Sequence, residues 1–179
     1  MAPVTLSESS IGVFIHGVTA LLSILKKAAE HKDAETFASS KLFDDMLPLT
    51  FQVQMVSNTA KKSVWRLTAD PALEVSWPDD EKTLEELIAR TEKTLDMLKT
   101  ADNALVDTKN DSSVDLAMGK RGNFKISGKE YVLSYALPNF FFHLVTAYGI
   151  LRSKGVELGK SDYLGSFMAG TSMVPAPAA

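Results

Sequence analysis

One segment, residues 138–164, limits the fold of this chain more than any other. Its apolar residues recur at the spacing of a helix that buries one face, at Phe140, Leu144, Ala147 and Leu151. Pro138 suits the first turn of such a helix, where an amide N–H is not needed, and Gly155 suits the position just after its last turn. We therefore predict a long helix between these two residues, packed against other helices.

Three earlier segments show the same helical period, at residues 9–30, 48–67 and 83–99. The first also has apolar residues on its opposite side, which predicts that it is buried twice, the second time against a second subunit. Gly12 and Gly17 within it predict a close approach to another helix. Thr83 and Glu86 form the pattern of a capping box at the start of the third segment, whose charged outer face, with the pair Glu86 and Arg90, we expect to be exposed.

A β-hairpin is predicted directly before the last long helix. Its strands would be marked by the alternating residues Phe124 and Ile126, a turn at 127–129, and then Tyr131, Leu133 and Tyr135. Residues 101–120 are polar, lack a helical period and predict a long connection, which allows a crossover in the bundle. We expect residues 1–170 to form a single all-α domain, a four-helix bundle with one small hairpin, and residues 171–179 to be a disordered tail.

Composition narrows the classes of function. The net charge is −3 and the lysines are dispersed, so we expect no nucleic-acid partner. There are no cysteines, and we find no signal peptide and no membrane-spanning run, so we expect a cytoplasmic protein with no membrane partner. The segment 155–161 resembles a phosphate-binding loop, but it has three residues between its glycines where that motif needs four, and it follows a helix.

His143 is the most reactive candidate residue, because it lies at the edge of the buried stripe with Asn139 one helical turn before it. A histidine in this position could serve as a general acid or base near neutral pH. The competing interpretation is structural, a histidine that hydrogen bonds to a neighbouring carbonyl or tyrosine. The sequence contains no His-x3-His or Glu-x-x-His pair, so we predict neither a metal site nor a cofactor.

Three stretches together resemble a fungal and bacterial branch, of unknown function, of the DinB/YfiT-like helical bundles. They are Asp45–Val53, Phe142–Arg152 and Gly155–Gly165, the last being the most specific. The resemblance covers nearly the whole chain and implies a four-helix bundle that is commonly dimeric. We therefore expect a homodimer.

The resemblance also implies a divalent metal held by three histidines, two of them in a His-x3-His pair, and in some relatives a transferase or isomerase activity. Here the matching positions carry Asn139 and His143, and Gln52 is the nearest polar residue on the second long helix. Because amides are poor ligands for zinc or nickel, this departure argues against a metal-dependent transferase.

The sequence therefore leaves two main hypotheses. In the first, the bundle binds a small, largely apolar molecule, with metal-independent isomerase- or lyase-type chemistry at His143 as an extension. The ligand-binding residues would be Phe51, Gln52, Asn139, Phe141, His143 and Tyr148. In the second, these residues only satisfy one another, and the protein is a non-enzymatic dimeric interaction or structural module.

Overall fold

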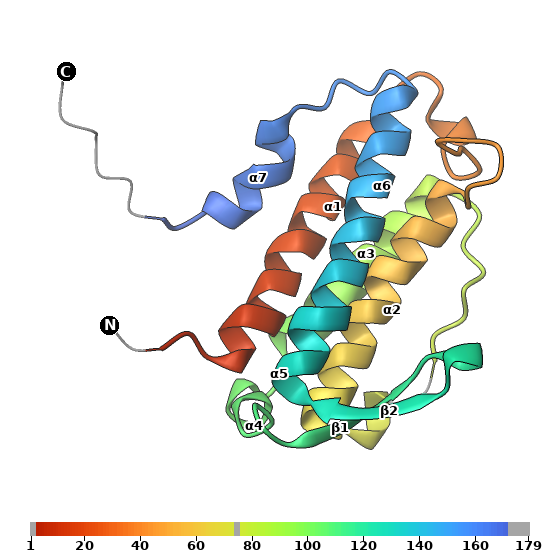
Figure 1. Ribbon diagram of the computed structural model, residues 1–179. Helices are drawn as coiled ribbons and strands as arrows, with labels where there is room; N and C mark the ends of the chain where they lie inside the picture. The colour runs from red at the N-terminus through yellow and green to blue at the C-terminus, as the bar shows by residue number, and fades with distance from the viewer. Residues whose placement is uncertain (1–2, 74–75, 172–179) are drawn as a thin grey trace, which may run out of the picture.

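The computed structural model describes residues 3–73 and 76–171, which form a helical bundle with a short β-hairpin at one end (Figure 1). Its four long helices are α1 (Val13–Ala29), α2 (Leu49–Thr68), α3 (Leu84–Lys99) and α6 (Leu137–Ser153). The predicted bundle and its four helical segments are confirmed. The predicted disordered tail, apart from residue 171, lies outside the described residues.

The long helices follow the order α1, α3, α2, α6 around the bundle, so that α1 and α2 lie diagonally across from each other. Helices α2 and α3 run in the same direction, and residues 76–83 therefore return along the length of the bundle to the start of α3 (Figure 1). The crossover of the bundle is therefore this segment and not, as predicted, the connection before the last helix, because α3 ends at the end of the bundle where α6 begins (Figure 1). Helix α4 (Asn103–Asp107) and the hairpin connect α3 to α6 across the end of the bundle.

Helices α1 and α6 pack closely at two phenylalanine rings. The rings of Phe14 and Phe140 lie 4.9 Å apart, and both side chains are fully buried. Gly17 faces the same phenylalanine, and a Cβ atom placed on it would lie only 2.7 Å from Phe140 Cζ. The close helix approach predicted at Gly17 is thus confirmed. The one predicted at Gly12 is wrong, because a Cβ atom there would meet only the Ser7 carbonyl oxygen, at 3.8 Å.

Helix α7 (Lys160–Met168), which the sequence did not predict, packs along α1. The Ser166 hydroxyl donates a hydrogen bond to the His16 carbonyl oxygen over 2.7 Å. Helix α3 lies against α1 as well, and Ala20 and Ile24 on the second side of α1 are buried within the chain. The two-sided pattern of α1 therefore has an intramolecular explanation, and no second subunit is needed to account for it.

Residues Glu8–Ala29 form a helix that is long and apolar enough to cross a membrane by length and composition alone. Half of this stretch is buried inside the bundle, where α1 packs against α3, α6 and α7. A helix in the core of a bundle can have the same length and apolar composition, and the packing of α1 accounts for its apolar character.

The hairpin precedes the last long helix as predicted, but its strands differ from the prediction. Strand β1 (Ser113–Ala117) pairs antiparallel with β2 (Asn123–Ser127), whereas Tyr131 and its neighbours are helical. The predicted turn is in fact a helix start, because Ser127 and Glu130 form a capping box that opens α5 (Gly128–Tyr131). Strand β1 lies within residues 101–120, which we predicted to be an irregular connection.

Pro138 lies in the first turn of α6, as predicted, but the helical path begins earlier. The helical path continues from α5 through a π-helical turn, Val132–Ala136, into α6. Proline inside a helix removes a hydrogen bond and crowds the carbonyl group four residues earlier, and a widened turn relieves that crowding. Gly155 ends α6 as predicted, with φ of +91° and a hydrogen bond from Val156 N–H to the Leu151 carbonyl oxygen.

Candidate functional site

The polar residues predicted on α6 face α2, and each has a partner there. His143 Nδ1 lies 2.8 Å from Gln52 Oε1, and Asn139 donates to Thr59 Oγ1 over 2.8 Å. The structure therefore brings Gln52, Asn139 and His143 to one seam between antiparallel helices. Because their polar atoms bond within that seam, the geometry favours the structural interpretation of Asn139.

The hydrogen bonds of Gln52 determine the tautomer of His143. Its amide nitrogen donates to the Leu47 carbonyl oxygen over 2.9 Å, which turns the amide oxygen toward the imidazole. An amide oxygen only accepts, so Nδ1 of His143 carries the proton and Nε2 keeps its lone pair. Burial lowers the pKa of His143, and the imidazole is therefore neutral at neutral pH.

The predicted aromatic residues separate into two groups. The Phe51 ring lies 5.8 Å from the His143 ring, as expected for a residue at that site. Phe141 instead faces α7, with its ring 6.1 Å from that of Phe167, and the Tyr148 hydroxyl donates to the Leu158 carbonyl oxygen over 3.4 Å. The six predicted ligand-binding residues thus do not line one pocket.

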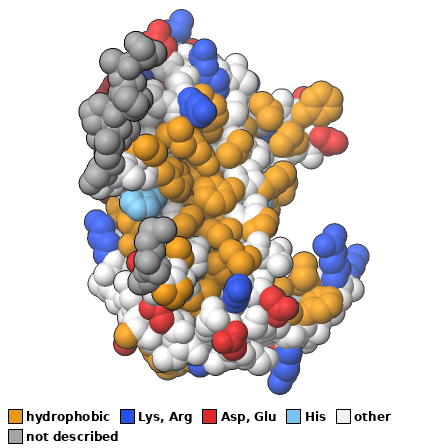
Figure 2. All heavy atoms as spheres, turned by 60° about the vertical axis from the view of Figure 1, so that its left-hand side comes forward, with side chains coloured by type: hydrophobic (Ala, Val, Ile, Leu, Met, Phe, Trp, Pro, Cys, Tyr) orange, Lys and Arg blue, Asp and Glu red, His pale blue; other side chains and the backbone are white. Residues whose placement is uncertain are grey.

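A cleft of about 250 Å³ lies between α6 and α7, on the side where Phe141 and Tyr148 point. It is lined by Val145, Tyr148, Lys160 and Tyr163, and His143 is not among its lining residues. Figure 2 shows a broad band of hydrophobic side chains on the face that includes these helices. Burial raises the pKa of Tyr163, which keeps its phenol protonated as a hydrogen-bond donor.

The donor atoms around His143 do not fit a three-histidine metal site. Gln52 Oε1 is occupied by the imidazole, and Asn139 stands where the second histidine of the pair would be. Within residues 3–73 and 76–171, no group of three or more histidine, cysteine, aspartate or glutamate side chains could hold a metal ion. His16 lies beside Phe167 and His31 beside Phe37, so neither supplements the site.

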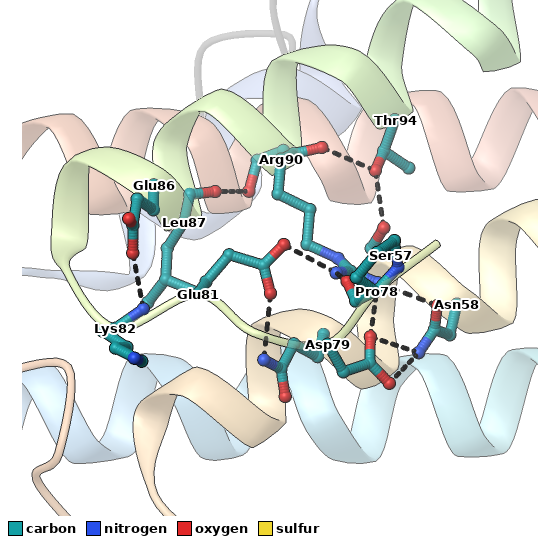
Figure 3. A network of polar contacts seen from close by, with 12 residues as sticks. Ser57, Asn58, Pro78, Asp79, Glu81, Lys82, Glu86, Leu87, Arg90 and Thr94 are labelled. Atoms are coloured by element: carbon teal, nitrogen blue, oxygen red, sulfur yellow. Dashed lines mark hydrogen bonds and ion pairs between the residues drawn. The ribbon is translucent and has the colours of Figure 1, made fainter. Parts of the chain in front are cut away.

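Sequence reasoning missed a polar network that is centred on Arg90 (Figure 3). Arg90 was predicted to be exposed and paired with Glu86, but its side chain is only 3% exposed and reaches toward α2. It forms ion pairs of 2.7 Å with Asp79 and with Glu81. Glu86 instead caps α3 by accepting from the Lys82 and Thr83 amides.

The hydrogen bonds and ion pairs of this network hold residues 78–81 against α2 and α3. Arg90 also donates to the Pro78 carbonyl oxygen and to Asn58 Oδ1 of α2, over 2.7 Å and 2.9 Å. Asn58 in turn donates to Asp79, and bonds from Arg90 and Gln54 outweigh burial to lower the pKa of Glu81. The acidic run at 79–81 was a signal for a cationic partner, although its identity could not be read from spacing.

The arrangement of the four long helices defines the class of this protein as a DinB-like helical bundle. The chain belongs to the DUF1993 family, since the model of that family, described as a domain of unknown function, matches residues 6–164. Its structure is similar to that of a DinB family member protein from Shewanella denitrificans, with a TM-score of 0.79 and 35% sequence identity over 96% of both chains. No curated protein matches the sequence.

Proposed function

We propose that this protein binds a small, largely apolar molecule with an anionic group in the cleft between α6 and α7. The observation that supports this proposal most directly is the lining of the cleft, with Val145 and two tyrosine rings as apolar walls and Lys160 as the charged residue. Such a lining of apolar walls with few polar groups is typical of small-molecule sites. The proposal retains Tyr148 as a binding residue and moves the site away from His143.

The charged group of the ligand would lie near Lys160. This lysine is the first residue of α7, where the positive end of the helix dipole also favours a negative charge, and the Asp162 carboxylate there already accepts a hydrogen bond from the Gly159 amide. The protonated Tyr163 phenol offers a further donor. A neutral ligand would gain only the apolar contacts, so the cleft favours an aromatic or branched carboxylate or sulfonate over its uncharged counterpart.

Fluorescence titration with two probes tests the proposal. The anionic probe is 8-anilinonaphthalene-1-sulfonate and the neutral one is N-phenyl-1-naphthylamine. We expect Lys160→Ala to raise the Kd of the anionic probe by about tenfold and to leave that of the neutral probe unchanged. Val145→Glu should weaken both, because it places a carboxylate on the apolar wall. Leu133→Ala, outside the cleft, is the control, and equal binding by all four proteins would refute the proposal.

A second candidate function is self-association as a homodimeric module, for which the outer face of α6 is the specific observation. Phe142 is 62% exposed and Val145 is 52% exposed. No charged residue occurs from Leu137 to Leu151, so two copies could pack this face together without burying an unpaired charge. Sedimentation velocity provides the test. We expect a dimer that Phe142→Asp converts to a monomer, and a monomeric parent protein would rule this function out.

A further inference from the structure

A small cavity beneath the hairpin lies outside both faces considered above. It occupies about 70 Å³ between α2, the end of β1 and the π-helical turn that precedes α6. Its polar lining residues are Asn58, Thr59, Lys62, Arg66, Tyr131 and Tyr135. The lining contains two cationic side chains and no carboxylate.

The two cations lie on the same side of α2, one helical turn apart. Within the described ranges 3–73 and 76–171, neither Lys62 nor Arg66 forms an ion pair with a carboxylate. Like charges at this spacing repel each other, and an anion bound between them would remove that repulsion. The nearest acidic side chain bonded to a lining residue is Asp79, through Asn58, and Arg90 already neutralises it.

The guanidinium group of Arg66 is held in place before any ligand binds. Its Nε atom donates to the Asp115 carbonyl oxygen over 3.0 Å, and its central carbon lies 5.3 Å from the centre of the Tyr131 ring. Its Nη1 atom also donates to the Lys62 carbonyl oxygen over 3.5 Å. The Nη2 atom therefore keeps the donors that remain for a ligand, and guanidinium donors match the geometry of a phosphate group.

Two tyrosines complete the lining from the opposite helix. Tyr131 is fully buried and shares a hydrogen bond of 2.9 Å with Ser63, and burial raises the pKa of Tyr131, so its phenol stays neutral. The Tyr135 ring lies 6.0 Å from the Tyr131 ring, and its hydroxyl makes no hydrogen bond to any residue that the structure describes. That hydroxyl is a donor available to a ligand.

We propose that this cavity binds a phosphate group through Arg66, Lys62 and the Tyr135 hydroxyl. The cavity volume corresponds to about two water molecules at about 30 Å³ each, which suits a single small oxyanion better than an organic ligand. The phosphate could be free or could belong to a phosphorylated metabolite whose organic part stays outside. The site is separate from the α6–α7 cleft and does not depend on the function proposed for it.

Isothermal titration calorimetry at constant ionic strength tests the proposal with inorganic phosphate, glycerol phosphate and chloride. We expect both phosphate compounds to bind and chloride not to bind. Tighter binding of inorganic phosphate would identify the free anion as the ligand, and tighter binding of glycerol phosphate would identify a phosphate monoester. If phosphate binds no better than chloride, the proposal is wrong.

Variants that preserve the fold locate the site. Lys62→Ala removes an exposed charge and Tyr135→Phe removes only a hydroxyl, and each should raise the Kd for phosphate by about tenfold. Lys120→Ala, an exposed lysine in the hairpin turn, is the matched control and should bind phosphate as the parent protein does. Unchanged binding by the Lys62 and Tyr135 variants would overturn the assignment even if the protein binds phosphate elsewhere.

Discussion

Replacing Arg90 by alanine tests how the segment between α2 and α3 is held. The guanidinium group donates four hydrogen bonds of 2.7–2.9 Å, two of them to the carboxylates of Asp79 and Glu81. Its Nε atom has no partner among the described residues, so the whole charge is compensated through the two terminal nitrogens. The Arg90→Ala variant would remove all four bonds and would leave Glu81, whose side chain is 13% exposed, with Gln54 as its remaining side-chain partner.

The expected loss of stability follows from how much of each partner is buried. Removing one partner of a fully buried ion pair destabilises a protein by about 3–5 kcal/mol. The Asp79 side chain is 46% exposed, so water replaces much of its interaction and its share is small. We therefore expect Arg90→Ala to lower the free energy of unfolding by about 3 kcal/mol, at the low end of that range.

Urea denaturation followed by far-UV circular dichroism measures this free energy. Trp77 lies in the same segment, with Lys93 Nζ 4.1 Å from its ring centre, and its fluorescence reports local release of the segment. Arg121→Ala, in the exposed hairpin turn, is the control and should change stability by less than about 0.5 kcal/mol. The reasoning is refuted if the Arg90 variant loses less than about 1 kcal/mol or behaves like the control.

Two further predictions concern pH and packing. Because the pKa of Glu81 is lowered, its ionised form stabilises the fold above the ordinary glutamate pKa of 4.5, and that contribution is lost as the pH falls through the lowered value. Glu81→Gln should therefore be less stable than the parent at pH 7, with the difference shrinking below about pH 4 in urea titrations; a constant difference would contradict this. Gly17→Ala should cost about 1–3 kcal/mol because its Cβ meets Phe140. Gly12→Ala, with no atom closer than 3.8 Å, should not destabilise, and thermal melts giving both variants the same midpoint would refute the packing argument.

The long helices could be predicted because their apolar stripes repeat over four or more turns. The hairpin could not be placed correctly, since Tyr131, Leu133 and Tyr135 alternate like a strand while Tyr131 and Tyr135 also have the i, i+4 spacing of a helix. The capping box of Ser127 and Glu130 decides the matter in favour of the helix. The Ser-x-x-Glu pattern of this capping box is visible in the sequence, but the alternating residues that follow it led us to predict a strand.

The site was predictable only in part, because spacing rules apply to residues on periodic helices and not to residues in irregular segments. Gln52 and His143 could be proposed as partners because both border apolar stripes of long helices. Arg90 could not be assigned, because its partners lie in an aperiodic segment and no spacing rule connects them. Helix α7 was missed as well, since it has nine residues with Gly165 among them and none of its residues is fully buried.

The π-helical turn at Val132–Ala136 has a consequence for how this fold tolerates changes in length. A π turn contains one residue more than an α turn, so the residues before and after it keep facing the same neighbour. Tyr131, before the turn, bonds to Ser63 of α2, and His143, after it, bonds to Gln52 of α2. Deleting one residue within the turn would keep both contacts, although it would crowd Pro138 against the carbonyl group four residues earlier. Deleting one residue elsewhere in α6 would instead rotate one part of the helix by about 100° relative to the other, so the π turn is the position in this helix where the fold tolerates a change of length.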